Sequence, residues 1–224
     1  MSTVIGIVVF PDVQLLDVAG PFDVFSDVDG IEVRIIAQTR EAVMPFALTN
    51  ASFIPQETLE EARPDVLLVP GGAGVRHLLG DAEALAAIAK IGTHAQFVTS
   101  VCTGGLVLGA AGLLSGYHAT THWRYLDLLD LVGAIPSKKR VVVDRNRITA
   151  GGVTAGIDFG LALLAKLSGE HVAMGRQLYL QYDPEPPFNA GVPETAPPQI
   201  VEEERAITQE RYDQRAALLI AALR

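Results

Sequence analysis

Residues 97–105 read FVTSVCTGG, an uncharged run that ends in a cysteine, a threonine and two glycines. The first five residues predict a buried β-strand, and the glycines predict the start of a helix. Cys102 then stands on a sharp strand-to-helix turn at the carboxyl edge of the sheet, where α/β proteins bind their ligands. Such a turn exposes a nucleophile and directs the backbone amides of the helix start toward it.

Strands and helices alternate on both sides of this turn. Because strands that alternate with helices form a mostly parallel sheet covered on both faces, the chain is predicted to be an α/β protein. The Gly20-Pro21 pair is expected to break or restart the first helix. Besides 97–101, the predicted strands are residues 4–10, 31–37, 66–69, 117–121, 141–143 and 147–149, the last two flanking a hairpin turn at 144–146. The predicted helices are residues 14–25, 81–91, 106–111, 151–167 (with Val153, Ile157, Leu161 and Leu164 facing inward) and 200–223.

The domain organisation is predicted to be simple. Residues 1–182 form one α/β domain, and residues 183–224 form a Pro-rich arm and a C-terminal helix packed on the same domain. No internal repeat divides the 224 residues, and their 49% hydrophobic content is enough for a large core.

Composition excludes several classes of partner. The net charge of -9 and the short basic run at 138–140 argue against nucleic-acid binding. Residues 91–123 lack charged side chains, but six glycines interrupt them, so we expect a buried core segment and no membrane span. A single cysteine excludes an intrachain disulfide, and the absence of a basic leader in residues 1–10 predicts a cytoplasmic protein.

Two side chains at the carboxyl edge are candidates for acid–base and nucleophilic chemistry. The helix start after Cys102 favours a thiolate, although a lone cysteine is also commonly a small buried apolar residue. Asp17 lies in an apolar stretch after the first strand, so burial should raise its pKa and make it a proton donor. Its alternative role is to accept hydrogen bonds from helix-start amides. Asp23, further along, is expected on the surface.

Glycines and histidines near this edge are weaker candidates. Gly71 and Gly72, in the sequence PGGAG at 70–74, could bring backbone amides close to a substrate. The pattern lacks the spacing of a dinucleotide or phosphate-binding loop. His118 or His122 could act as a base for the thiol, or could make an ordinary hydrogen bond. The histidines show no metal-ligand spacing, so we expect no metal.

Five motifs, in order along the chain, carry a resemblance to a known family. They are VPGG at 69–72, SVCTG at 100–104, AGLLSG at 111–116, ATTHW at 119–123 and AGGVTAGID at 150–158. From about residue 4 to residue 182 the chain resembles the ThiJ/PfpI superfamily. The resemblance implies a class I glutamine-amidotransferase-like (flavodoxin-like) α/β sandwich with a nucleophile elbow, assembled as a homodimer.

Within the superfamily, most members carry a glutamate where this chain has Asp17. Asp17, Thr103 and the ATTHW motif together resemble the isocyanide hydratase branch. The resemblance implies hydration of isocyanides to N-substituted formamides through a thioimidate on Cys102. Asp17 would be the general acid and base, Thr103 would support the site, and no metal or organic cofactor would be needed. Gly71, Gly72 and His122 would line the substrate pocket.

Other functions remain open at this point. The same motifs occur in the sensor half of AraC-type regulators, but only about 25 residues follow the arm and they begin with the acidic run 202–204, which does not suit a DNA-binding half. A stress-response or oxidant-sensing role for Cys102 is a second alternative, against which Asp17 counts because the usual carboxylate there is glutamate. A protease or amidotransferase would need a histidine beside the cysteine, and Thr103 occupies the following position.

Overall fold

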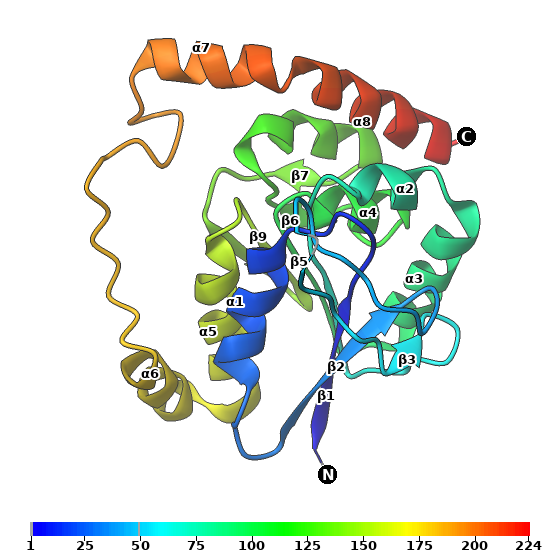
Figure 1. Ribbon diagram of the computed structural model, residues 1–224, viewed down its shortest axis with the longest axis vertical. Helices are drawn as coiled ribbons and strands as arrows, with labels where there is room; N and C mark the ends of the chain where they lie inside the picture. The colour runs from blue at the N-terminus through cyan, green and yellow to red at the C-terminus, as the bar shows by residue number, and fades with distance from the viewer. Residues whose placement is uncertain (1, 49) are drawn as a thin grey trace.

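The computed structural model describes residues 2–48 and 50–224, and a mostly parallel seven-stranded sheet lies at its centre (Figure 1). The strand order is β3-β2-β1-β4-β5-β9-β8, and β8 is the antiparallel member. The strands are β1 (Thr3–Val8), β2 (Ile31–Ala37), β3 (Glu57–Thr58), β4 (Val66–Val69), β5 (Phe97–Val101), β8 (Val141–Asp144) and β9 (Arg147–Ala150). A separate two-stranded sheet pairs β6 (His118–Ala119) with β7 (Ile135–Pro136).

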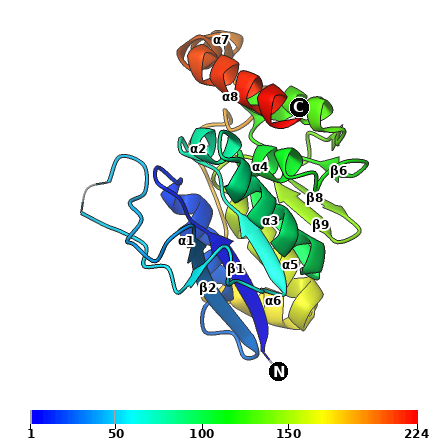
Figure 2. The ribbon, with the colours of Figure 1, turned by 90° about the vertical axis from the view of Figure 1, so that its right-hand side faces the viewer.

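Helices cover both faces of the large sheet, which confirms the predicted fold class (Figures 1 and 2). One face carries α1 (Leu15–Phe25), α5 (Ala155–Ser168) and α6 (Glu170–Tyr179), and the other carries α2 (Val75–Leu79), α3 (Ala82–His94) and α4 (Gly104–Ala110). The remaining helical elements are η1 (Trp123–Val132), α7 (Pro198–Ile207) and α8 (Gln209–Ala222). Because both faces are covered, all four residues of β4 are fully buried, as expected for a continuous apolar run.

Helix α1 runs without interruption through Pro21, so the predicted break at Gly20-Pro21 is wrong. The two residues lie against the start of α5. A Cβ on Gly20 would be 3.2 Å from the Ile157 side chain, and one on Gly156 would be 3.1 Å from the Pro21 ring. This close packing compensates for the backbone hydrogen bond that proline cannot donate.

The inward face of α5 agrees with the prediction at Leu164 and differs from it in part elsewhere. Phe159, Leu163 and Leu164 are fully buried, whereas Ile157 and Leu161 are half-buried, as is Val153 before the helix begins. Gly156 and Gly160 explain why the Phe159 side of α5 faces inward, because they let α5 pack closely against α1 on that side. A Cβ on Gly160, for example, would lie 2.9 Å from the Val24 side chain.

The C-terminal region forms two helices where one is predicted, with the break at Thr208. The Thr208 hydroxyl donates a hydrogen bond to the Glu204 carbonyl at 2.6 Å, a local bond that often bends helices. Helices α2, α6 and η1 have no counterpart in the prediction, and the strand predicted at 117–121 is reduced to β6. Helix α6 was not predicted because its sequence lacks a strong apolar stripe; Ala173 is its buried residue.

An exposed arm, residues 183–197, connects α6 to α7 at the opposite end of the molecule (Figure 1). After the arm, α8 contacts α2, α4 and η1, and Leu219 is fully buried there. Helix α8 therefore lies over the carboxyl edge of the sheet, close to the turns that follow β4 and β5.

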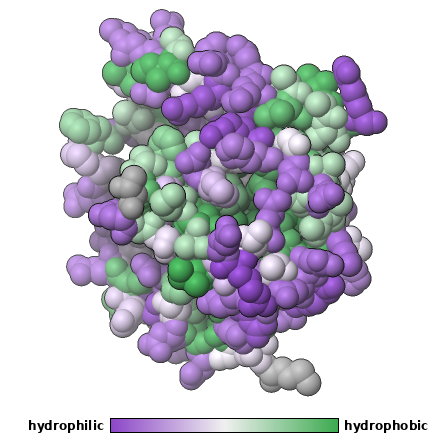
Figure 3. Space-filling view, turned by 45° about the vertical axis from the view of Figure 1, so that its right-hand side comes forward, coloured by the Kyte–Doolittle hydropathy of each residue, from purple (hydrophilic) through white to green (hydrophobic). Residues whose placement is uncertain are grey.

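The surface mixes hydrophilic and hydrophobic residues. On the face in Figure 3, hydrophobic residues form separate patches among hydrophilic ones. Across the described part of the chain, no helix combines the length and apolar character that crossing a membrane requires.

Candidate active site

Cys102 lies on the turn between β5 and α4, where the sequence places it. Its backbone is left-handed, with φ of 54°, a strained conformation for a non-glycine residue that is typical of functional turns. Its N–H lies 3.1 Å from the Ala150 carbonyl oxygen and 2.8 Å from that of Gly151. Its carbonyl oxygen accepts a hydrogen bond from the Thr121 hydroxyl at 2.7 Å. These bonds from two other segments hold the turn in place.

Two glycines allow the chain to pack closely around this turn. A Cβ on Gly104 would overlap the Val69 carbonyl oxygen at the end of β4. A Cβ on Gly71 would lie 2.5 Å from the Thr103 nitrogen and 2.9 Å from the Cys102 Cβ. The turn after β4 and the turn after β5 can therefore touch only because both positions lack a side chain.

The carboxyl group of Asp17 is fully buried in the first turn of α1 and points into the same site. Its Oδ2 accepts a hydrogen bond from the Gly71 amide at 2.8 Å, while Oδ1 has no N–H or O–H donor within the described residues. Burial raises the pKa of Asp17 from 3.8 to about 7, against the smaller lowering effects of the Gly71 amide and the Cys102 thiol. The predicted upward shift is thus present, and near neutral pH the group can both give and take a proton.

The thiol of Cys102 is only 5% exposed, and its pKa is raised, not lowered. Burial and the nearby Asp17 charge raise it, while the Thr103 amide, the Arg215 charge and the Thr103 hydroxyl lower it. The Thr103 amide at the helix start does favour the thiolate, as expected, but desolvation of the buried thiol outweighs it. Cys102 and Asp17 are neighbouring buried groups, so the protonation of each depends on that of the other.

Thr103 and Gly72 connect the two turns. The Gly72 amide donates a hydrogen bond to the Thr103 Oγ1 at 3.2 Å. The amides of Gly71 and Gly72, which the sequence suggests as a cradle for substrate, thus both have acceptors within the site. In this arrangement they fix the positions of Asp17 and Thr103.

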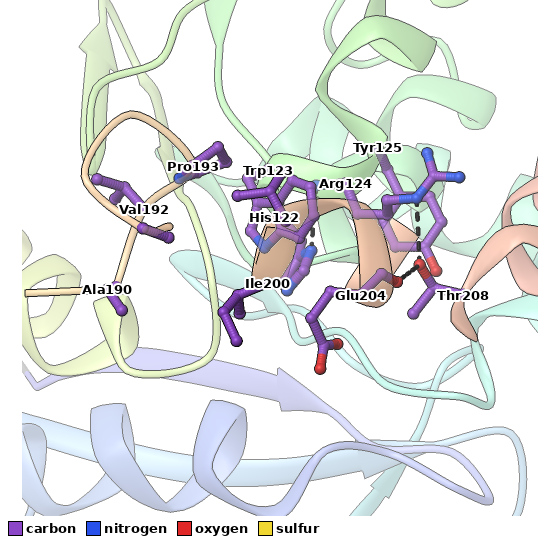
Figure 4. A pocket seen from close by; sticks show the side chains of 13 residues that line it. His122, Trp123, Arg124, Tyr125, Ala190, Val192, Pro193, Ile200, Glu204 and Thr208 are labelled. Atoms are coloured by element: carbon purple, nitrogen blue, oxygen red, sulfur yellow. Dashed lines mark hydrogen bonds between the residues drawn. The ribbon is translucent and has the colours of Figure 1, made fainter. Parts of the chain in front are cut away.

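His122 follows Thr121, whose hydroxyl bonds the Cys102 carbonyl oxygen, and lines a pocket of about 300 Å³ that neither Cys102 nor Asp17 lines (Figure 4). The pocket lies between the start of η1, the arm and α7, and Trp123 and Ile200 are among its apolar walls. Burial, together with the charges of Arg215 and Arg124, lowers the pKa of His122 to about 4, so the ring is neutral at pH 7. Its Nδ1 accepts a hydrogen bond from the Arg124 amide at 3.3 Å.

The structure therefore does not bring every candidate together. No hydrogen bond joins His122 or the exposed His118 to Cys102 in residues 2–48 and 50–224, and Asp23 is exposed, as expected. Within the same residues, no group of three or more potential ligands could hold a metal ion.

Arg215 is a further residue near the site, and it was not predicted from the sequence. This side chain of α8 is 7% exposed, donates a hydrogen bond to the Gly72 carbonyl at 2.7 Å and stacks over the Tyr125 ring at 4.5 Å. A signal was present, because Arg215 shares the inward face of α8 with Leu219, one turn further on. A charged residue on an apolar helix face is rarely buried without a specific contact.

A cysteine on a strained strand-to-helix turn, beside a buried carboxyl group at the carboxyl edge of a parallel sheet, places the chain among the α/β proteins whose strand-to-helix elbow carries a cysteine. The chain belongs to the DJ-1/PfpI family, which matches residues 3–166. This assignment confirms the resemblance to the ThiJ/PfpI superfamily.

Individual relatives cover most of the chain. An isonitrile hydratase of Pseudomonas putida is 48% identical over 92% of this chain and 90% of its own. The crystal structure of a ThiJ/PfpI family protein from Pseudomonas syringae superposes with a TM-score of 0.93 at 41% identity, covering 98% of this chain and 91% of that one. The HTH-type transcriptional regulator GbdR of Pseudomonas aeruginosa is 31% identical over 49% of this chain but only 30% of its own length.

Proposed function

We propose that this protein is a cofactor-independent cysteine enzyme that hydrates isocyanides (isonitriles) to N-substituted formamides. The 48% identical relative over 92% of the chain is named isonitrile hydratase. The observation that carries the mechanism is the buried Asp17 carboxyl group beside Cys102, with a pKa of about 7. A group with that pKa can accept and return a proton in one turnover.

The first step joins sulfur to carbon. Asp17, ionised, takes the proton of the Cys102 thiol as the sulfur attacks the terminal carbon of the isocyanide. The same carboxyl group then delivers this proton to the carbon, whose lone pair accepts it. The product is a thioimidate, with one new C–S bond and one new C–H bond, and Asp17 is ionised again.

The second step releases the product. Asp17 removes a proton from water while the resulting hydroxide adds to the thioimidate carbon, and the nitrogen takes up that proton. The tetrahedral intermediate then collapses: the C–S bond breaks, and the hydroxyl proton returns through Asp17 to the Cys102 sulfur. The formamide leaves, and the thiol and carboxylate are restored.

The neighbouring residues would serve this cycle in different ways. Thr103 would stabilise the sulfur through its amide and hydroxyl, since both lower the pKa of the thiol. Gly71 would orient the Asp17 carboxyl group through its amide. Gly72 and the neutral His122 would border the space that receives the substituent of the isocyanide. Every proton transfer in this cycle is assigned to Asp17.

The test is incubation with a simple alkyl isocyanide, followed by detection of the N-alkylformamide. Cys102→Ala and Cys102→Ser should abolish product formation, because the thioimidate cannot form. Asp23→Asn, an exposed change on the same helix as Asp17, is the matched control and should leave the rate unchanged. Wild-type turnover in Cys102→Ala would contradict the nucleophile assignment.

The other candidate functions have less support. An oxidant sensor needs an accessible thiolate, whereas Cys102 is 5% exposed and its pKa is raised. The similarity to the regulator GbdR covers only 30% of that protein. We further propose that the enzyme acts as a homodimer in the cytoplasm and that residues 183–224 act with residues 1–182 as one unit.

A further inference from the structure

Arg215 is a buried cation without an acidic partner. None of the ion pairs formed by residues 2–48 and 50–224 includes it, although its side chain is 7% exposed. Its partners are a backbone carbonyl, that of Gly72, and an aromatic face, that of Tyr125. Burying an unpaired charge costs several kcal/mol, so a buried arginine of this kind calls for a compensating role.

Both partners of Arg215 belong to the surroundings of the elbow. Gly72 donates its amide to the Thr103 hydroxyl and accepts from Arg215 through its carbonyl, so one peptide segment links α8 to the residue after Cys102. Tyr125 lies in η1, and its ring is 5.9 Å from the His122 ring. The guanidinium is thus fixed from two sides, beside the segment that contacts Thr103, and its charge lowers the pKa of the Cys102 thiol.

We propose that Arg215 is a positioning residue of the Cys102 site: it holds the Gly72 segment in place and supplies the positive charge that stabilises the sulfur whenever it carries negative charge. The sulfur is negative twice in the proposed cycle, during attack on the isocyanide and when the C–S bond breaks. Helix α8 therefore completes the site that β5 and α4 begin.

The other ionisable groups around the sulfur come from several elements. Asp17 on α1 opposes the negative sulfur, His122 before η1 is neutral at pH 7, and Tyr125 on η1 stacks against the guanidinium. Arg211, one turn before Arg215 on α8, is exposed. Arg215 is therefore the buried cation among these groups, and removing its charge should change the reactivity of the sulfur.

The experiment measures alkylation of the thiol by iodoacetamide as a function of pH, followed by mass spectrometry. Cys102 is the only cysteine, so the signal has a single source. Arg215→Met and Arg215→Gln remove the charge, Arg215→Lys keeps it, and Arg211→Met is the matched control on the same helix. Arg215→Met should fold, because an apolar side chain can replace an unpaired buried charge at little cost.

We expect the two neutral replacements to raise the apparent pKa of the thiol by about one unit, which slows alkylation at neutral pH about tenfold. Arg215→Lys should stay within about threefold of the wild type, and Arg211→Met should not differ from it. An unchanged alkylation profile in a folded Arg215→Met or Arg215→Gln protein would overturn the proposal. A purely structural role would lower the melting temperature without moving the profile.

Turnover supplies a second readout. If Arg215 acts on the sulfur, kcat for isocyanide hydration should fall about tenfold in the neutral variants while KM changes little. This part of the inference rests on the proposed function, but the alkylation profile does not. A wild-type protein that fails to hydrate isocyanides would refute the proposed function and leave the role of Arg215 to be decided by alkylation alone.

Discussion

The buried Asp17 carboxyl group has two possible roles in the site, as a proton carrier and as a structural hydrogen-bond acceptor. As a proton carrier it must change its ionisation during turnover, whereas as a structural acceptor it only needs to hold the Gly71 amide. Substitutions of similar size distinguish these roles, because an amide can accept the same hydrogen bond but cannot carry the proton.

We expect Asp17→Asn to lower the rate of isocyanide hydration by about 10² or more, the usual contribution of a general acid–base group. Asp17→Glu keeps the proton but moves it by one methylene toward the sulfur, so part of the activity should remain. Steady-state rates of the two folded variants decide the point. The reverse order, with Glu more damaging than Asn, would refute the proton-transfer role.

The raised pKa of Asp17 also predicts a pH-dependent stability. Because the folded protein holds this proton more tightly than the unfolded chain does, the contribution of Asp17 to stability is present below pH 4 and is lost as the pH rises toward 7. The Asp17→Asn variant has no carboxyl group at this position, so it does not lose stability in this way as the pH rises. The free energy of unfolding of Asp17→Asn relative to the wild type should therefore increase by up to about 4 kcal/mol between pH 4 and pH 8.

Urea titrations of both proteins at several pH values measure this difference, and the titration of all other groups cancels between the two. A difference that is flat with pH would show that Asp17 has the same pKa in the folded and the unfolded chain, contrary to the raised pKa. The variant would then be less active without being more stable at pH 8.

These residues were predictable from the sequence to different degrees. Cys102 and Asp17 could be placed because each follows a recognisable strand, and carboxyl edges of parallel strands meet. The charge state of Cys102 could not be predicted, because it depends on how completely the surrounding segments exclude water. Arg215 was missed because it comes from a helix that is distant in sequence and reaches the site only after the arm has crossed the molecule.

At the scale of elements, contacts between the turns after β4 and β5 depend on missing side chains. Gly104→Ala should destabilise the protein by about 2–3 kcal/mol and abolish activity, because the new methyl group would overlap the Val69 carbonyl oxygen. Thermal unfolding and the hydration assay measure both effects.

Gly175→Ala is the matched control for this substitution. Gly175 lies in α6 with no atom within 4 Å of the added Cβ, so alanine should be neutral or stabilise the helix by up to about 1 kcal/mol. If Gly104→Ala were as stable and active as Gly175→Ala, the close contact between the two turns would not be needed.

The elements themselves were predictable wherever one short-range pattern determined them. Strands β1, β4 and β5 are uncharged runs, and β2 alternates apolar and charged residues before its buried end. The β8–β9 hairpin has a polar turn within one residue of its predicted place. The errors arose where distant packing decides the outcome. Pro21 is tolerated because α5 supports α1. The inner face of α5 is formed by Phe159, Leu163 and Leu164 together with its glycines.

At the scale of the whole molecule, the proposed homodimer is open to direct measurement. Light scattering at micromolar concentration should give a mass near twice the 23.8 kDa of one chain. The family resemblance is the basis of this expectation, and obligate dimers keep their mass on moderate dilution. A mass near that of a single chain would contradict it.

The exposed arm has a consequence for how the site is assembled. Residues 183–197 are a linker, and they keep α7 and α8 covalently attached to the domain on which these helices pack. The linker sets the effective concentration of α8 near the site, so diluting the protein does not dissociate Arg215 from its contacts. A single proteolytic cut in this linker would change this, because α7 and α8 would become a separate peptide. The binding of that peptide to the rest of the protein would then depend on its concentration.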